Sequence, residues 1–212
     1  MNIFEGKSAN LEWAFATEAL SGEVDCGDHG VVQPFDGGIL LGVIDGIGHG
    51  KEASAAALVA AELLKLRPRD SVISLVQLIH DRLRTTRGVV MTLASLNCRD
   101  NTLTWIGVGN VAGSLHSKNS DGALSVESVV LRGGMIGVQL PPLRAEVLPL
   151  RKGSLLIFAT DGVYGGVSVG VNMQGPVREI CERMMREYSK GQDDALVLAA
   201  RYLGGDDEEA ST

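Results

Sequence analysis

The stretch "LLGVIDGIGHGKEASAAALVAAELL", residues 40–64, joins two kinds of local structure through a glycine-rich loop. The run Ile39–Ile44 is apolar without interruption, which predicts a strand buried on both faces. The run Glu52–Leu64 is rich in alanine and leucine, so it predicts a helix. Asp45 leaves the strand into the loop, where a carboxylate can cap a helix, form a turn or bind a cation. The rest of the sequence has to distinguish these roles.

The composition predicts a single folded domain. The chain has 212 residues, of which 45% are hydrophobic and 21% charged, so it can bury a substantial core. No proline-rich or serine-rich linker divides it, and we expect one domain over residues 1–203. Residues 204–212 are acidic and lack large apolar side chains, which predicts a flexible tail.

Charge and hydropathy exclude several classes of function. The formal net charge of −7 disfavours nucleic acid as a partner. There is no cationic start followed by an apolar segment and no apolar run of about 18 residues, so neither secretion nor membrane insertion is supported. The three cysteines, Cys26, Cys98 and Cys181, are far apart and form no metal-binding pair. They fit a reduced, cytoplasmic protein in which cysteine packs as a small apolar residue.

Outside the opening stretch, the sequence predicts two more helices among short strands. Asp70 or Ser71 can cap a helix whose apolar positions run from Val72 to Leu83, and the third helix is expected over Pro176–Tyr188. Short strands are expected on both sides of the hairpin signal at residues 99–101 and at 110–116, 125–131, 144–150, 154–160 and 195–203.

This order of elements predicts the α+β class. Helices do not follow every strand, so a doubly wound parallel sheet is disfavoured. Meandering antiparallel strands with two adjacent helices early and one late predict a sandwich of antiparallel sheets flanked by helices.

Acidic residues recur at strand ends or beside glycines. They occur in "CGDHG", "VIDGIGHG", "FATDGVYGG" and "GQDDALVL", at Asp28, Asp45, Asp161 and Asp193-Asp194. They lie too far apart for one calcium loop, whose ligands fall within about 12 residues, but neighbouring strands can bring them together. Two carboxylates about 4 Å apart repel by about 4 kcal/mol at an effective dielectric constant near 20, so such a cluster requires cations. Oxygen ligands select Mg²⁺ or Mn²⁺, and a pair of these ions supports phosphoryl transfer to water.

Each motif alone also has a simpler interpretation. Asp-Gly is a common turn dipeptide, and Asp28 or the pair Asp193-Asp194 can be a cap or a surface acid. His49 can be an ordinary loop residue or the acid that protonates a leaving oxygen. The glycine loop fits neither a P-loop nor a dinucleotide-binding fingerprint, because its glycines and Lys51 have the wrong spacing.

Taken together and in order, "DGIGHGKEASAAA", "ATDGVYGG" and "DDALVL" resemble the metal-dependent serine/threonine protein phosphatases of type 2C. Within this family, called PPM, the chain is similar to the bacterial branch of SpoIIE, RsbU and RsbX. The resemblance extends from about Leu11 to Leu203 and implies the PPM fold, a four-layer αββα sandwich of two antiparallel sheets.

The resemblance also implies roles for individual residues. Asp45 would bridge two Mn²⁺ or Mg²⁺ ions, and the carbonyl of Gly46 would bind one of them. The remaining assignments make Asp161 and Asp193 ligands of the first ion and Asp28 a ligand of the second. Asp194 would be either a residue that supports the ligands or an alternate ligand, and His49 a general acid. A third ion, which some bacterial members hold near the segment after Asp161, is not expected.

The implied function is that of a phosphoserine/phosphothreonine phosphatase in which a water bridging the two metals attacks phosphorus. Because the chain begins almost at the catalytic fold, we expect an arrangement like that of stand-alone RsbX. The implied partners are phosphorylated STAS-domain proteins of a stress-signalling complex, the stressosome. The alternatives are a catalytically silent binding module of the same fold and another two-metal phosphohydrolase, such as a nuclease.

Overall fold

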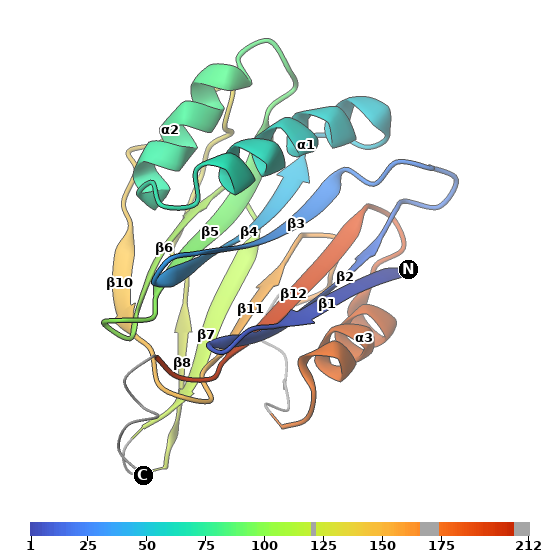
Figure 1. Cartoon of the computed structure of the whole chain (residues 1–212). Helices are drawn as coiled ribbons and strands as arrows, with labels where there is room; N and C mark the ends of the chain where they lie inside the picture. The colour runs from blue at the N-terminus through green and yellow to red at the C-terminus, as the bar shows by residue number, and fades with distance from the viewer. Residues whose placement is uncertain (120–121, 166–173, 206–212) are drawn as a thin grey trace.

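The computed structural model describes residues 1–119, 122–165 and 174–205 and shows two β-sheets packed face to face (Figure 1). In strand order, sheet A contains β1 (Asn2–Lys7), β2 (Leu11–Glu18), β12 (Ala195–Tyr202), β11 (Leu155–Ala159), β7 (Ala112–Lys118) and β8 (Leu124–Ser128). Sheet B contains β10 (Glu146–Pro149), β6 (Thr102–Val108), β5 (Val89–Asn97), β4 (Gly38–Gly46) and β3 (Asp28–Phe35), and β9 (Leu131–Arg132) pairs with β6.

Helices cover the outer face of each sheet, so the predicted four-layer α+β sandwich is confirmed (Figure 1). The helices α1 (Lys51–Leu66) and α2 (Val72–Arg82) pack on sheet B, and α3 (Val177–Tyr188) packs on sheet A. The predicted boundaries hold closely. Ser71 caps α2 by accepting a hydrogen bond from the amide of Ser74, and Pro176 precedes the first turn of α3.

The continuous apolar run of β4 follows from its position between two cores. Ile39, Leu41 and Val43 point into the layer between the sheets, whereas Leu40 and Ile44 point to α1 and α2. Because side chains alternate along a strand, a strand covered on both faces must be apolar at every position.

Two features of the strands depart from the predicted pattern. Sheet B is mixed rather than purely antiparallel, because β9 runs parallel to β6. The predicted strand over 125–131 is divided between the sheets: β8 pairs with β7 in sheet A, and β9 pairs in sheet B. The chain crosses between the layers at Val129, whose amide donates to the carbonyl of Gly113. Alternation alone could not reveal this crossing, since both halves of the run have strand propensity.

In the described parts of the chain, no helix is both long and apolar enough to cross a bilayer. The predicted tail begins at residue 204, and residues 206–212 lie outside the described ranges.

The packing of α1 on sheet B can be tested with two leucines of the same helix. Leu64 is fully buried against sheet B, whereas Leu66 is 75% exposed. We expect Leu64→Ala to lower the free energy of unfolding by about 2–5 kcal/mol and the control Leu66→Ala to change it by less than about 0.5 kcal/mol. Urea unfolding measures both values, and equal effects would contradict the assigned packing.

Candidate metal centre

Strand pairing brings together the two acids that are separated by a hairpin. β3 begins at Asp28 and β4 ends near Asp45, and these two residues are direct cross-strand partners. Like charges facing each other across a sheet are unfavourable. The register therefore places a repulsive pair at one end of sheet B.

Sheet A brings its own acids to the same end of the sandwich. Asp161 follows β11, and Asp193 precedes β12, its antiparallel neighbour. The two strand ends are joined because the amide of Thr160 donates to the carbonyl of Leu196 over 3.0 Å. Both Asp161 and Asp193 are exposed.

The electrostatics show that the acids from the two sheets act on one another. Burial, and after it the nearby carboxylates of Asp161 and Asp193, together raise the pKa of the Asp45 carboxyl to about 7. Burial also raises the pKa of Asp28 well above its usual range, the charge of Asp45 adds to this, and a hydrogen bond with Thr160 offsets part of it. Four distant segments of the sequence therefore share one electrostatic site.

Asp28 has an oxygen that no protein group satisfies. Its side chain is 4% exposed, and Oδ2 has no hydrogen-bond partner among the described residues. A buried carboxylate oxygen without a partner is costly, and a bound cation would remove the cost. The donor set also fits, because carboxylate and carbonyl oxygens are the ligands that Mg²⁺ and Mn²⁺ prefer.

The acids do not yet form a closed ligand set. In the ranges that the structure describes, no three His, Cys, Asp or Glu side chains are grouped so that they could hold an ion as they stand. Their oxygens would have to approach one another on binding, which exposed Asp161 and Asp193 have room to do.

Asp194 connects the two sheets. Its Oδ1 accepts from the amide of Leu20 and its Oδ2 from the amide of Gly27, both at 2.8 Å. The carboxylate is 4% exposed. These two bonds hold the segment before Asp28 against the start of β12, so both oxygens already have backbone partners.

Two glycines permit the close approach of backbone that the site requires. An added Cβ at Gly46 would overlap the carbonyl oxygen of Ala53 in the first turn of α1. One at Gly162 would overlap the carbonyl oxygen of Asp194. The glycines of the two Asp-Gly dipeptides are therefore needed for close packing as well as for turning the chain.

His49 lies in the loop between Asp45 and α1. Its Nδ1 is 2.9 Å from Oε1 of Glu23, and its side chain is 58% exposed. This contact joins the loop before α1 to the loop before β3. A carboxylate on one ring nitrogen orients the other, so Glu23 fixes the direction in which Nε2 points.

Several neighbours of the site were not predicted from the sequence. Asn110 donates from Nδ2 to Oδ2 of Asp161 at 2.8 Å. Arg87 pairs with Glu52 at 2.6 Å, and its Nη1 would lie 2.9 Å from a Cβ at Gly48. Arg87 reaches the glycine loop from the turn after α2, so no local sequence pattern marks it. The segment considered for a third metal includes residues 166–173, which lie outside the described ranges.

The raised pKa of Asp45 predicts how stability depends on pH without divalent ions. The pKa rises from 3.8 to about 7 on folding, so the folded state holds this proton more tightly. The resulting contribution to the free energy of unfolding is complete below about pH 4 and is lost as the pH rises through about 7. In EDTA at pH 8, the free energy of unfolding of Asp45→Asn, measured with urea, should therefore exceed that of the native protein by about 2–4 kcal/mol. At pH 4 the two values should differ little. A native protein as stable as the variant at pH 8 would contradict the interpretation.

The comparisons with known proteins agree with this geometry. The profile of the family described as stage II sporulation protein E (SpoIIE) matches residues 36–203. Phosphoserine phosphatase RsbX of Bacillus subtilis (strain 168) is 25% identical over 142 residues, which cover 67% of this chain and 69% of that protein.

Solved structures share the fold over almost the whole chain. A structure from work on the bacterial stressosome as a modular system adapted to control secondary messenger signalling is 30% identical, with a TM-score of 0.82. The match covers 90% of this chain and 99% of the other. RsbX in complex with magnesium superposes with a TM-score of 0.83 at 20% identity, over 95% of this chain and 100% of that one. The chain belongs to the SpoIIE family and has the PP2C-type phosphatase fold.

Proposed function

We propose that this chain is a metal-dependent phosphatase that hydrolyses phosphoserine and phosphothreonine in proteins. The observation that supports the proposal best is the pair of buried Asp28 and half-buried Asp45, which face each other on neighbouring strands with raised pKa values. Protein groups alone leave this pair unfavourable, and divalent cations would stabilise it.

The proposed ligands are those that converge from both sheets. Two Mn²⁺ or Mg²⁺ ions would be held by Asp28, Asp45, the carbonyl of Gly46, Asp161 and Asp193. Ions bound there would supply positive charge that makes water more acidic and stabilises the phosphoryl oxygens. Because both oxygens of Asp194 accept from backbone amides, we assign Asp194 to holding Gly27 and the following Asp28 in place.

Other residues of the chain position groups around this centre. Asn110 donates a hydrogen bond to Oδ2 of Asp161, which leaves Oδ1 as the proposed oxygen for an ion. His49, oriented by Glu23, is the proposed proton donor to the leaving oxygen of serine or threonine.

The substrate proposal extends what is known of the relatives to this chain. The relative RsbX is a phosphoserine phosphatase, and the 30% identical structure comes from work on the stressosome. We propose that the substrates are phosphorylated STAS-domain proteins of such a complex, and that the protein acts in the cytoplasm as a single domain over residues 1–203.

The two alternatives account for less of the molecule. A silent binding module would have no use for two acids that repel each other across neighbouring strands. A nuclease needs a basic surface to hold its polyanionic substrate, and the chain has a net charge of −7.

Removal of one of the carboxylates proposed to hold the ions should remove most of the activity without unfolding the protein. With Mn²⁺ present, we expect Asp45→Asn to lose at least about 10³-fold in activity on p-nitrophenyl phosphate, since it removes one of the two facing carboxylates proposed to hold the ions. The matched control is Asp81→Asn, an exposed acid that pairs with Arg84, and it should retain native activity. A native protein inactive in Mn²⁺ and Mg²⁺ would favour the binding module instead.

The role of His49 can be separated from that of the metals by the leaving group. p-Nitrophenolate leaves without protonation, whereas the serine oxygen requires an acid. His49→Gln should therefore lower turnover of a phosphoserine protein by about 10²-fold or more but change turnover of p-nitrophenyl phosphate by less than about threefold. Glu23→Gln should give a smaller loss of the same kind. Equal losses on both substrates would show that His49 does not donate the proton.

A further inference from the structure

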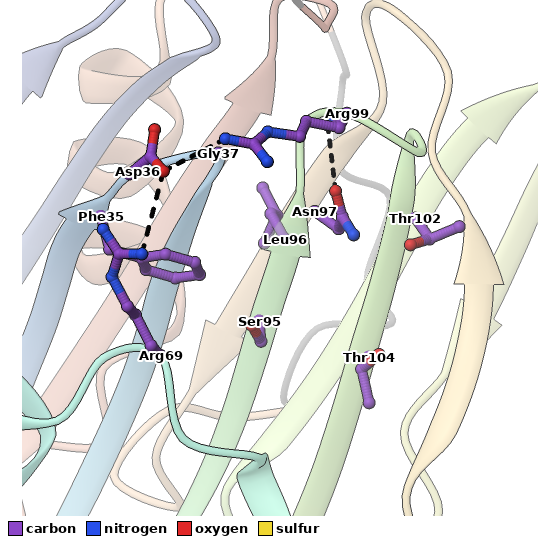
Figure 2. A pocket seen from close by; sticks show the side chains of 10 residues that line it. All are labelled: Phe35, Asp36, Gly37, Arg69, Ser95, Leu96, Asn97, Arg99, Thr102 and Thr104. Carbon is purple, nitrogen blue, oxygen red and sulfur yellow. Dashed lines mark hydrogen bonds and ion pairs between the residues drawn. The ribbon is translucent and has the colours of Figure 1, made fainter.

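A polar cavity lies at the end of sheet B opposite to the carboxylates. Asp28 begins β3 and Phe35 ends it, so the two ends are about 23 Å apart at about 3.3 Å per residue. The cavity has a volume of about 310 Å³. Figure 2 shows its lining, which comes from the β3–β4 turn, the β5–β6 hairpin and the connection between α1 and α2.

The floor of the cavity is a part of the outer face of sheet B where apolar side chains give way to polar ones. Met91 and Leu93 of β5 are covered by the helices. The next positions on the same face are Ser95 and Asn97, and Thr104 lies beside them on β6. The change from apolar to polar side chains coincides with the end of the helical cover, as expected for a solvated edge. A solvated edge explains the polar side chains of the floor, but it does not explain why charged side chains gather above them.

Two guanidinium groups from different loops converge on one carboxylate oxygen. Nη2 of Arg99 is 3.1 Å and Nη1 of Arg69 is 3.8 Å from Oδ2 of Asp36. Figure 2 shows both side chains directed at Asp36 above the sheet. Among the residues that line this cavity, two positive charges face a single negative one, in a chain whose net charge is −7.

The backbone holds Arg99 in this position. Gly37 has φ 78°, and a Cβ there would lie 2.8 Å from Nε of Arg99, so the guanidinium rests directly on the turn. The hairpin that carries Arg99 is fixed by Asn97, whose Oδ1 accepts from the amides of Arg99 and Asp100. The arginine therefore does not depend on Asp36 alone for its placement.

The chemistry of the cavity selects a ligand class. Arginine pairs with phosphate through parallel hydrogen bonds, and it does so better than with a single carboxylate oxygen. The hydroxyl floor can bond the hydroxyl groups of a ligand. A second cavity of about 270 Å³ shares Arg69, Ser95 and Thr104 and enlarges the space for a small molecule. It is also lined by Asp70, whose carboxylate pairs with Arg67. We propose that this cavity binds a small phosphorylated, hydroxyl-bearing ligand, such as a sugar phosphate, whose phosphate displaces Asp36 from between the two arginines.

The test uses ribose 5-phosphate as the probe and the full chain in EDTA, which prevents phosphate from binding through metal ions at the carboxylates. Amide chemical shifts of the ¹⁵N-labelled protein report where the probe binds. We expect shifts at Gly37, Arg99 and Thr104 that saturate, and none of comparable size at Gly46 or Gly162. The largest shifts at the carboxylate end would overturn the proposal.

Variants of opposite expected effect make the test sharp. Arg99→Ala and Arg69→Ala should each weaken binding about tenfold or more, whereas Asp36→Asn should tighten it about threefold because the competing carboxylate is gone. The control is Arg84→Ala, which removes an equally exposed arginine paired with an aspartate elsewhere. Unchanged affinity in Arg99→Ala, or weaker binding in Asp36→Asn, would overturn the proposal.

Two further probes separate the parts of the ligand. Ribose should bind at least tenfold more weakly than ribose 5-phosphate, and inorganic phosphate should also bind more weakly. If ribose binds as tightly as ribose 5-phosphate, the arginines do not bind the phosphate group. If inorganic phosphate binds as tightly, the polar floor does not bind the sugar hydroxyl groups. Either result would overturn the proposal. None of these outcomes depends on phosphatase activity, so the proposal can fail while the proposed function stands.

Discussion

The candidate site depends on the two hydrogen bonds that the Asp194 carboxylate accepts from the amides of Leu20 and Gly27. The bond from Gly27 connects the start of β12 in sheet A to the start of β3 in sheet B, and the bond from Leu20 holds the chain that leaves β2. The apolar layer between the sheets holds them face to face, but apolar packing is not directional and tolerates small shifts. The charge-assisted bonds fix the relative position of the sheets at the end where Asp28, Asp45, Asp161 and Asp193 meet.

The same end of the molecule shows how a fold can hold an arrangement that is unfavourable in itself. Asp28 and Asp45 repel, and burial increases the cost of charging them. Their positions are nevertheless imposed by eight cross-strand pairs between β3 and β4 and by the apolar layers on both faces of β4. A core of this size can support about a few kcal/mol of local strain at a functional site. At such a site the residues that function requires can differ from those that would stabilise the fold best.

Most of the fold could be predicted from periodicity, and the acids could be identified as candidates from their place at strand ends. The helix boundaries near Ser71 and Pro176 followed from capping and proline chemistry, and the buried strand Ile39–Ile44 followed from its uninterrupted apolar run. The crossing at Val129 could not be predicted, because it depends on which sheet each half of the run pairs with. Arg87 and Asn110 were missed for the same reason: their contacts are long-range, and no local pattern marks them. The structural role of Asp194 emerged only when the positions of Leu20 and Gly27 were known.

The pairing of Asp28 with Asp45 also has a consequence for how fast the protein is degraded in a cell. A ligand that binds only the folded state protects it from transient opening, and proteases cleave opened chains. On the proposed function, molecules made when manganese or magnesium is scarce would open more often and be degraded sooner than loaded ones. The abundance of this phosphatase would then follow the supply of divalent ions, and the cell would adjust its amount without any dedicated regulator.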